Sequence, residues 1–135
     1  MDGLKQIACA TDFSQASNRA IEMTRYLQEK TGAKVTLIHV LNTAGFAIPG
    51  PSDDLETRQR EETKALDALV TTFGNGARST LLEGDPARAI AVYAESNTPD
   101  LLIIGSHYYK GMAHMLHDSV SEATLSSVEC PILRC

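Results

Sequence analysis

Leu101-Leu102-Ile103-Ile104-Gly105-Ser106-His107 is the stretch that decides the fold. Its four consecutive apolar residues predict a strand that is buried on both faces, as in a parallel sheet covered by helices. Gly105 then allows the backbone to turn sharply away from the strand. Further along, Ser119-Val120-Ser121-Glu122 predicts the start of a helix, because Ser119 and Glu122 form a capping box. A loop between a strand end and a helix N-terminus favours an anion, so we place the functional site here.

The rest of the chain alternates strands with helices. Apolar and β-branched runs mark the strands, and capping residues mark the helix starts. Helical connections of this length join parallel strands. The sequence therefore predicts one α/β domain, residues 1–135, with a doubly wound, Rossmann-like open sheet of five parallel strands. The expected strands are residues 7–11, 34–40, 77–83, 101–104 and 132–134, and the expected helices begin at Ser14, Ser52, Asp85 and Ser119.

Side-chain patterns also predict the buried face of the first helix and the position of the third strand in the sheet. Ala16, Ala20, Met23 and Leu27 recur at helical spacing and predict the buried face of the first helix. The third strand, residues 77–83, carries polar side chains in its first half. An edge position tolerates such residues, so we expect this strand at an edge of the sheet.

Composition narrows the class of protein. The chain of 135 residues carries a formal net charge of −5, whereas a nucleic-acid-binding protein presents a basic face. Its first residues do not have the pattern of a signal peptide, and no apolar run approaches the length of a membrane span. Cys9, Cys130 and Cys135 have no CxxC spacing and are expected to be reduced thiols. We therefore expect a cytoplasmic protein that binds neither nucleic acid nor a membrane.

Four features are distributed along the chain. The first three are Thr11-Asp12-Phe13-Ser14, Leu37-Ile38-His39-Val40 and Gly84-Asp85-Pro86. The fourth is the Leu101 stretch together with the helix start at Ser119 and Cys130-Pro131-Ile132-Leu133. Together they resemble the universal stress protein family. The resemblance implies the sheet order 3-2-1-4-5 and a homodimer formed through the C-terminal strand. It also implies a role in stress responses, exerted through a protein partner.

Members of this family that bind ATP carry the pattern G-x-x-G-x9-G-[ST]. Here Gly105 takes the first glycine position and Ser119 the hydroxyl position, but Tyr108 and Asp118 replace the other two glycines. A carboxylate at Asp118 would repel the phosphates, since two unit charges ~4 Å apart cost roughly 4 kcal/mol at an effective dielectric of ~20.

The resemblance nevertheless implies a site for ATP or AMP, with or without Mg²⁺. Asp12 matches the family residue near the nucleoside, and Val40 matches the position whose backbone meets the adenine. The expected nucleotide-binding residues are Ala10, Thr11, Asp12, Ser14, Val40, Gly105, Ser106, His107, Gly111, Ser119, Val120 and Ser121.

The histidines have plainer explanations than ligand binding. His39 lies in an apolar strand, where a satisfied core or rim histidine is more common than a ligand. His107, His114 and His117 share one loop, and such a set can bind Zn²⁺. Only Asp118 joins them as a further ligand, so we interpret them as solvated loop side chains and expect no metal.

No motif predicts catalysis, because the GxSxG, GxxxxGK[ST] and GxGxxG patterns are absent from the sequence. The first hypothesis is a homodimeric stress sensor that binds an adenine nucleotide and is not an enzyme, beyond slow incidental ATP hydrolysis. The alternative is a family member that binds no nucleotide and acts as a dimeric scaffold, as Tyr108 and Asp118 favour. A phosphorylated receiver domain shares the topology, but the expected acidic pair and the lysine after the last strand are missing.

Overall fold

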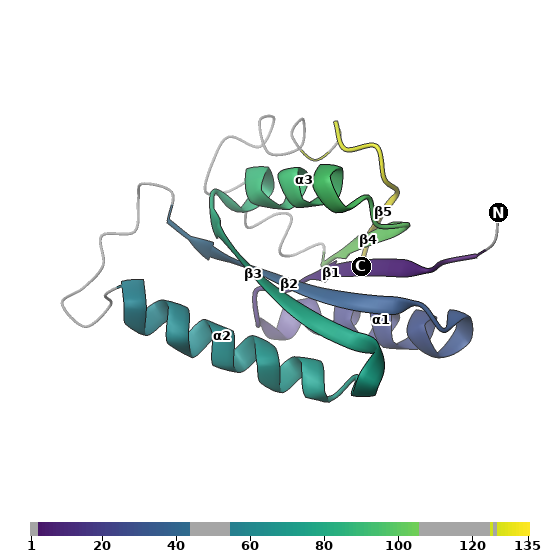
Figure 1. The fold of residues 1–135 in the computed structure, drawn as a ribbon, viewed down its shortest axis with the longest axis horizontal. Coiled ribbons are helices and arrows are strands. Elements are labelled where there is room, and N and C mark those ends of the chain that lie inside the picture. The colour runs from purple at the N-terminus through teal and green to yellow at the C-terminus, as the bar shows by residue number, and fades with distance from the viewer. Residues whose placement is uncertain (1–2, 44–54, 106–124, 126) are drawn as a thin grey trace.

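The computed structural model describes residues 3–43, 55–105, 125 and 127–135. These residues form a five-stranded parallel sheet in the order β3-β2-β1-β4-β5 (Figure 1). The fold class and strand order expected from the sequence are confirmed. The elements are β1 (Gln6–Ala10), η1 (Gln15–Ser17), α1 (Asn18–Thr31), β2 (Lys34–Asn42), α2 (Leu55–Thr71), η2 (Gly74–Gly76), β3 (Ala77–Gly84), α3 (Pro86–Asn97), β4 (Leu101–Ile104) and β5 (Ile132–Arg134).

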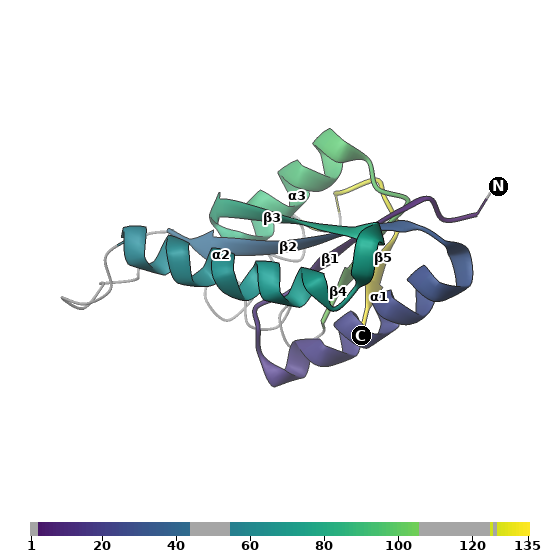
Figure 2. The same cartoon turned by 60° about the horizontal axis from the view of Figure 1, so that its bottom comes forward.

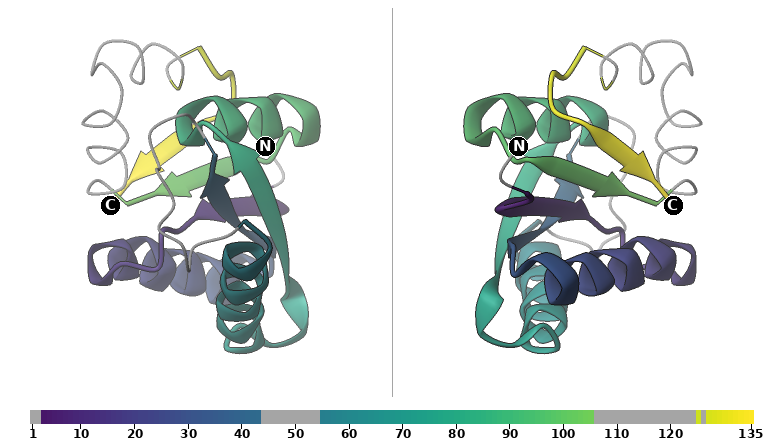
Figure 3. Two further views of the ribbon diagram at one scale, coloured as in Figure 1. Left: turned by 90° about the vertical axis from the view of Figure 1, so that its left-hand side faces the viewer. Right: turned by 90° about the vertical axis from the view of Figure 1, so that its right-hand side faces the viewer.

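Helices cover both faces of the sheet. α1 and α2 lie against one face and α3 against the other, as the rotated view in Figure 2 shows. Figure 3 shows the same layers from the two ends of the twisted sheet. Successive residues of a strand point to opposite faces, so both faces of the central strands are apolar. The core under α3 contains Ala8, Ala10, Ile38, Leu102 and Ile104, and the core under α1 and α2 contains Ile7, Cys9, Leu37, Leu66 and Ile103.

The predicted strand in the Leu101 stretch forms as β4, with Leu101 half-buried at its start. Leu102, Ile103 and Ile104 are each fully buried, and they point alternately into the two cores. β3 lies at an edge of the sheet and is only half-buried along most of its length, which confirms its expected position.

The structure corrects two details. The buried residues of α1 are Ala20, Ile21 and Thr24, and Met23 is 38% exposed because the helix is rotated relative to the expected face. β2 also continues two residues beyond Val40, which places that residue inside the strand. The expected helix starts at Ser52 and Ser119 lie outside the described residues.

Capping residues mark the helix ends where the sequence predicts them, with Ser14 and Asp85 at helix starts and Gly32 at a helix end. The Ser14 hydroxyl accepts a hydrogen bond from the Ser17 amide and starts the short η1 turn that leads into α1. Gly32 ends α1 in the left-handed conformation, with φ at 73°. Asp85 caps α3 through the amide of Arg88, with Pro86 in the first turn. None of the helices in the described segments has the length and apolar character needed to cross a membrane.

At the amino-terminal edge of the sheet, Asp100 ties β1 to β4. Its Oδ2 accepts hydrogen bonds from the amides of Lys5 and Gln6, each at 2.9 Å. These two bonds favour the ionised carboxyl and hold the pKa of Asp100 below its ordinary value of 3.8. A lowered folded-state pKa gives stability above the unfolded-state value, and this stability is lost as the pH falls through the folded-state value.

We therefore expect Asp100→Ala to lower the melting temperature at pH 7. The difference from the wild type should shrink as the pH falls below the ordinary carboxyl value of 3.8 and through the lowered pKa of Asp100, because both proteins then lack the charged acceptor. Thermal unfolding followed by circular dichroism across this range checks the expectation. Glu29→Gln, at an exposed carboxylate on α1, is the control and should change the melting temperature little at either pH. A difference independent of pH would contradict the role of the charge.

Candidate functional site

The carboxyl ends of β1, β2 and β4 meet at one edge of the sheet. The strand order reverses at β1, because the chain adds β2 and β3 on one side and β4 and β5 on the other. In open α/β sheets, such a reversal opens a crevice outside the strand ends, and ligands bind there. Ala10 pairs with Ile104, so the next residues, Thr11 and Gly105, leave the sheet side by side. The predicted site residues Thr11 and Gly105 thus lie next to each other where β1 and β4 end.

Val40 lies on the other side of β1. The pairing of β1 with β2 ends at Ala10 and Ile38, with one further bond from the Thr11 amide to the Ile38 carbonyl. β2 then continues to Asn42. The backbone of Val40 therefore runs past the end of β1, on the side where the crevice opens, while its side chain is buried in the core under α3.

Asp12 is the carboxylate that directly follows β1 and Thr11 at this edge of the sheet. Its Oδ1 accepts a hydrogen bond from the Ser14 amide at 2.9 Å, which fixes the turn out of β1. Its second oxygen, Oδ2, makes none of the hydrogen bonds found among the described residues. The side chain is half-buried. Asp12 is therefore held in place by one oxygen and can accept a hydrogen bond from a ligand with the other.

Thr11 organises the same turn from beneath. Its hydroxyl is buried, accepts a hydrogen bond from the Phe13 amide at 3.0 Å and lies 3.1 Å from the hydroxyl of Ser17. Phe13 has a φ of 64°, a left-handed conformation that an aromatic residue adopts only at a cost. The hydroxyl of Thr11 helps to hold this conformation.

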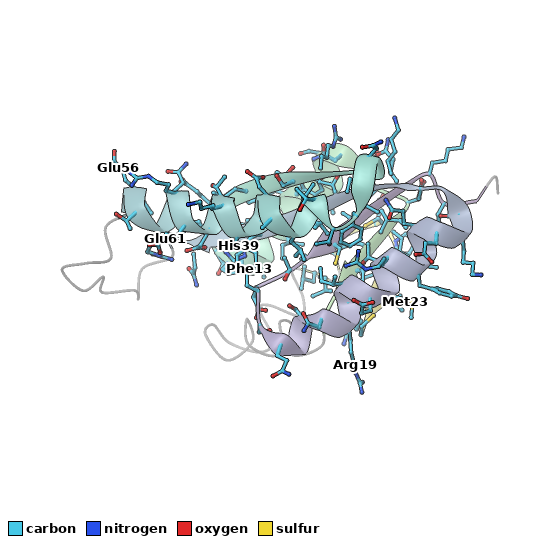
Figure 4. The ribbon with its side chains drawn as sticks, turned by 90° about the horizontal axis from the view of Figure 1, so that it is seen from below. Phe13, Arg19, Met23, His39, Glu56 and Glu61 are labelled. Atoms are coloured by element: carbon cyan, nitrogen blue, oxygen red, sulfur yellow. The ribbon has the colours of Figure 1, made fainter. Side chains whose placement is uncertain are left out.

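His39 joins the turn to α2. Its Nδ1 lies 2.8 Å from the carbonyl oxygen of Thr11, and its Nε2 lies 2.5 Å from Oε1 of Glu62. The ring of Phe13 packs on the imidazole with 4.3 Å between the ring centroids. Figure 4 shows Phe13 and His39 beside each other next to α2. The expectation that His39 is a satisfied histidine at the rim of the core is confirmed.

Half of the expected nucleotide-binding residues can be placed. Ala10, Thr11, Asp12, Ser14, Val40 and Gly105 come together at the carboxyl edge of β1, β2 and β4. The other six, together with the residues of the three-histidine loop, lie outside the described residues: Ser106, His107, Gly111, Ser119, Val120, Ser121, Tyr108, His114, His117 and Asp118. Within the described part of the chain, no three His, Cys, Asp or Glu side chains are grouped closely enough to hold a metal ion.

Sequence reasoning missed Phe13 and Glu62 as parts of the site. Glu62 lies 23 residues after His39 and one turn after Arg58, and no local spacing signals its contact with the histidine. The signal that could have identified Phe13 is its position directly after Asp12, where the chain must turn sharply out of the strand.

The fold and the crevice define a class, the α/β proteins with an open, doubly wound parallel sheet whose ligand site lies at the strand ends. A family model for the universal stress protein family matches residues 3–135. The chain belongs to the universal stress protein family.

Relatives agree with this assignment. Universal stress protein MJ0531 of Methanocaldococcus jannaschii is 27% identical over 136 residues, which cover 96% of this chain and 80% of that protein. A universal stress protein solved in complex with cAMP superposes with a TM-score of 0.70 at 18% identity, covering 98% of this chain and 97% of that one. A universal stress protein from Archaeoglobus fulgidus, solved in complex with dAMP, gives a TM-score of 0.65 at 15% identity, with coverage of 99% and 98%. At these identities the two structures establish the shared fold.

Thr11→Val tests the organisation of the turn. The valine keeps the volume of the side chain but removes the buried acceptor of the Phe13 amide and the contact with Ser17, so we expect a loss of about 1–3 kcal/mol in unfolding free energy. Urea denaturation measures this loss. Thr71→Val is the control, because the Thr71 hydroxyl is exposed and bonds only within its own helix. Equal effects of the two substitutions would contradict the role given to Thr11.

Proposed function

We propose that this protein binds an adenine nucleotide in the crevice at the β1–β4 boundary. The observation that carries the proposal is the held carboxylate of Asp12, whose Oδ1 fixes the turn while Oδ2 is left for a ligand. A carboxylate oxygen in this position suits a ribose hydroxyl, which donates a hydrogen bond. The structures of relatives with cAMP and dAMP support an adenine nucleotide as the ligand class.

Each described residue of the crevice has a part in this proposal. The backbone of Val40, past the end of β1, meets the edge of the adenine. Gly105 begins the loop that would approach the phosphates. By the family resemblance, Ser106, Ser119 and Ser121, which lie outside the described residues, would offer hydroxyls to the phosphates of ATP or AMP, with or without Mg²⁺.

We propose binding and signalling rather than catalysis, in the cytoplasm. His39 and Glu62 lie near the crevice and contact each other, and the second ring nitrogen of His39 bonds to the carbonyl oxygen of Thr11. We therefore propose that neither side chain is arranged to activate water. The three cysteines are free thiols. Burial raises the pKa of the Cys9 thiol to about 12, so it is an unreactive core residue of the kind that a reducing compartment tolerates.

The nucleotide is tested by thermal-shift titration with ATP, ADP and AMP, each with and without Mg²⁺. A ligand at ~100 times its dissociation constant stabilises by about 2.7 kcal/mol, which raises the melting temperature by several degrees. Asp12→Asn keeps an oxygen for the Ser14 amide but removes the charge, and we expect about tenfold weaker binding. Glu95→Gln, at an exposed carboxylate on α3, should bind as the wild type does.

The outcomes separate the candidate functions. A rise in melting temperature with AMP but not with ATP would mean that the nucleoside binds as proposed. It would also mean that Tyr108 and Asp118 prevent the longer phosphate chain from binding. No shift with any nucleotide would contradict the proposal and favour a family member that acts only as a dimeric scaffold.

We also propose a homodimer formed through β5. This strand lies at an edge of the sheet, where a second copy can add its own β5. Beside the edge lies a groove of about 710 Å³ between α1 and β5, and Met23 and Tyr26 of α1 are exposed along it. Figure 4 shows Met23 projecting outward from α1. The dimer would cover both the edge and these apolar side chains, and would offer the protein partner a surface made from two copies.

Tyr26→Asp should disrupt this dimer. The substitution places a charge on a side chain that is 55% exposed in one copy and buried in the proposed interface. Sedimentation equilibrium should show the wild type at twice the 14.6 kDa chain mass and the variant at the chain mass. Val92→Asp on α3 is the matched control, because Val92 is also 55% exposed but lies on the opposite face. A monomeric wild type would contradict the proposed dimer, and a dimeric Tyr26→Asp variant would contradict this interface.

A further inference from the structure

The hydrogen bonds of His39 require an additional proton. Its Nδ1 faces the carbonyl oxygen of Thr11, which only accepts, so Nδ1 must carry a hydrogen. Its Nε2 faces the carboxylate of Glu62 at 2.5 Å. A neutral imidazole with its hydrogen on Nδ1 would present a lone pair to that carboxylate. The contact therefore holds only when one more proton lies between Nε2 and Glu62.

The surroundings place this proton on the imidazole. On α2, Nε of Arg58 lies 3.7 Å from Oε2 of Glu62 and forms an ion pair with the carboxylate. On the β1 side, the face of Phe13 covers the ring, and an aromatic face attracts a cation. The charged group there is Asp12, whose Oδ1 is turned to the Ser14 amide.

The remaining neighbour on the sheet is neutral. β3 brings the uncharged Leu81 opposite His39 in the strand register. The His39 side chain is 9% exposed, so solvent does little to replace these partners. Among the described residues, the charged groups nearest this link are therefore Glu62, which contacts the ring, Arg58, which contacts Glu62, and Asp12 in the turn after β1.

We propose that His39 and Glu62 form a proton-dependent link between α2 and the turn after β1, and that this link positions Asp12 in the crevice. His39 contacts Thr11 directly before Asp12 and Phe13 directly after it. His39 is thus a positioning residue, acting through the two neighbours of the ligand-binding carboxylate. The link itself is a property of the free protein, and only its effect on nucleotide affinity rests on the proposed function.

The direction of the pH effect follows from the hydrogen-bond pattern. At lower pH the imidazolium donates to both Thr11 and Glu62, and the link is closed. As the pH rises and the proton leaves, the lone pair on Nε2 repels the carboxylate of Glu62. Phe13 then loses the cation beneath its ring while still in its unfavourable left-handed conformation. The turn that carries Asp12 should therefore loosen as the pH rises.

Glu62 has an alternative partner that stabilises the open state. Arg58 contacts the other carboxylate oxygen, and it also donates to the carbonyl oxygen of Asn42 at the end of β2. When the His39 contact is lost, Glu62 keeps an ion pair on its own helix. Opening the link therefore leaves the half-buried carboxylate of Glu62 paired with Arg58.

Glu62→Gln is the decisive substitution. The glutamine amide can donate to Nε2 of a neutral imidazole, so the link stays closed without the extra proton and becomes independent of pH. Glu61→Gln is the matched control, because it makes the same charge change at the preceding residue, which is exposed. Glu62→Ala removes the link at every pH. Figure 4 shows where Glu61 projects from α2.

The test is nuclear magnetic resonance of the ¹⁵N-labelled free protein from about pH 5.5 to pH 9, the range in which histidines titrate. In the wild type and Glu61→Gln, we expect both ring nitrogens of His39 to carry hydrogens at the low end and only Nδ1 at the high end. Hydrogen exchange at the Phe13 and Ser14 amides, corrected for its intrinsic pH dependence, should become at least about threefold faster across the same transition. In Glu62→Gln the ring should be neutral throughout and exchange should not change.

The opposite results overturn the proposal. A ring of His39 that does not change its protonation over this range would exclude the switch. Titration of the ring without any change at Phe13 and Ser14, or with the same change in Glu62→Gln, would exclude the link to the turn.

Titration with AMP at both ends of the pH range separates this proposal from the proposed function. The phosphate of AMP titrates identically in every variant, so the comparison between variants isolates the protein. We expect affinity to fall about threefold or more at high pH in the wild type and Glu61→Gln, but less in Glu62→Gln. If AMP does not bind but the resonances of His39 change as expected, the proton-dependent link is upheld and the proposed nucleotide binding is rejected. Equal pH dependence in Glu62→Gln would reject the positioning of Asp12 by His39.

Discussion

The structure depends on the burial of β1 and β4 from both sides. Two adjacent parallel strands with apolar side chains on both faces can be stable only if helices cover each face, and every parallel connection supplies such a helix. In this chain, α1 and α2 cover one face and α3 the other. Because all five strands run in the same direction, their carboxyl ends gather at one edge. The gathering of the strand ends at the proposed site is therefore a consequence of how the core is closed.

The polar groups at that edge are shared between structure and function. Asp12 uses one oxygen for the turn, and Thr11 uses its hydroxyl for Phe13 and its carbonyl for His39. The same bonds that stabilise the exit from β1 hold the groups that a nucleotide would meet. A ligand that meets Asp12 would contact a turn that is already organised, so this turn would lose little conformational entropy on binding.

His39 shows how a buried polar residue can connect distant parts of the chain. Its ring lies between a turn near the N-terminus and a helix that begins at residue 55, and it bonds to both. Among the described residues, its two ring nitrogens bond to one backbone carbonyl and one carboxylate, so the link consists of one imidazole and one carboxylate. In the proposed link, the proton on His39 changes the contact between α2 and the turn after β1 while the strands stay paired.

The sequence by itself determined the fold class, the strand order through the family resemblance, and the caps at Ser14 and Asp85. These follow from local signals, namely apolar runs, capping residues and motifs, which depend on neighbours in the chain. Only the tertiary structure decided that Met23 is exposed and that β2 extends past β1. Only it showed that His39 meets Glu62 and Phe13. The exposure of Met23 and the contact of His39 with Glu62 depend on how α1 and α2 are rotated as they pack on the sheet. β2 extends past β1 because it remains paired with β3 as far as Asn42 and Gly84. These arrangements are set by contacts between distant parts of the chain rather than by any local spacing.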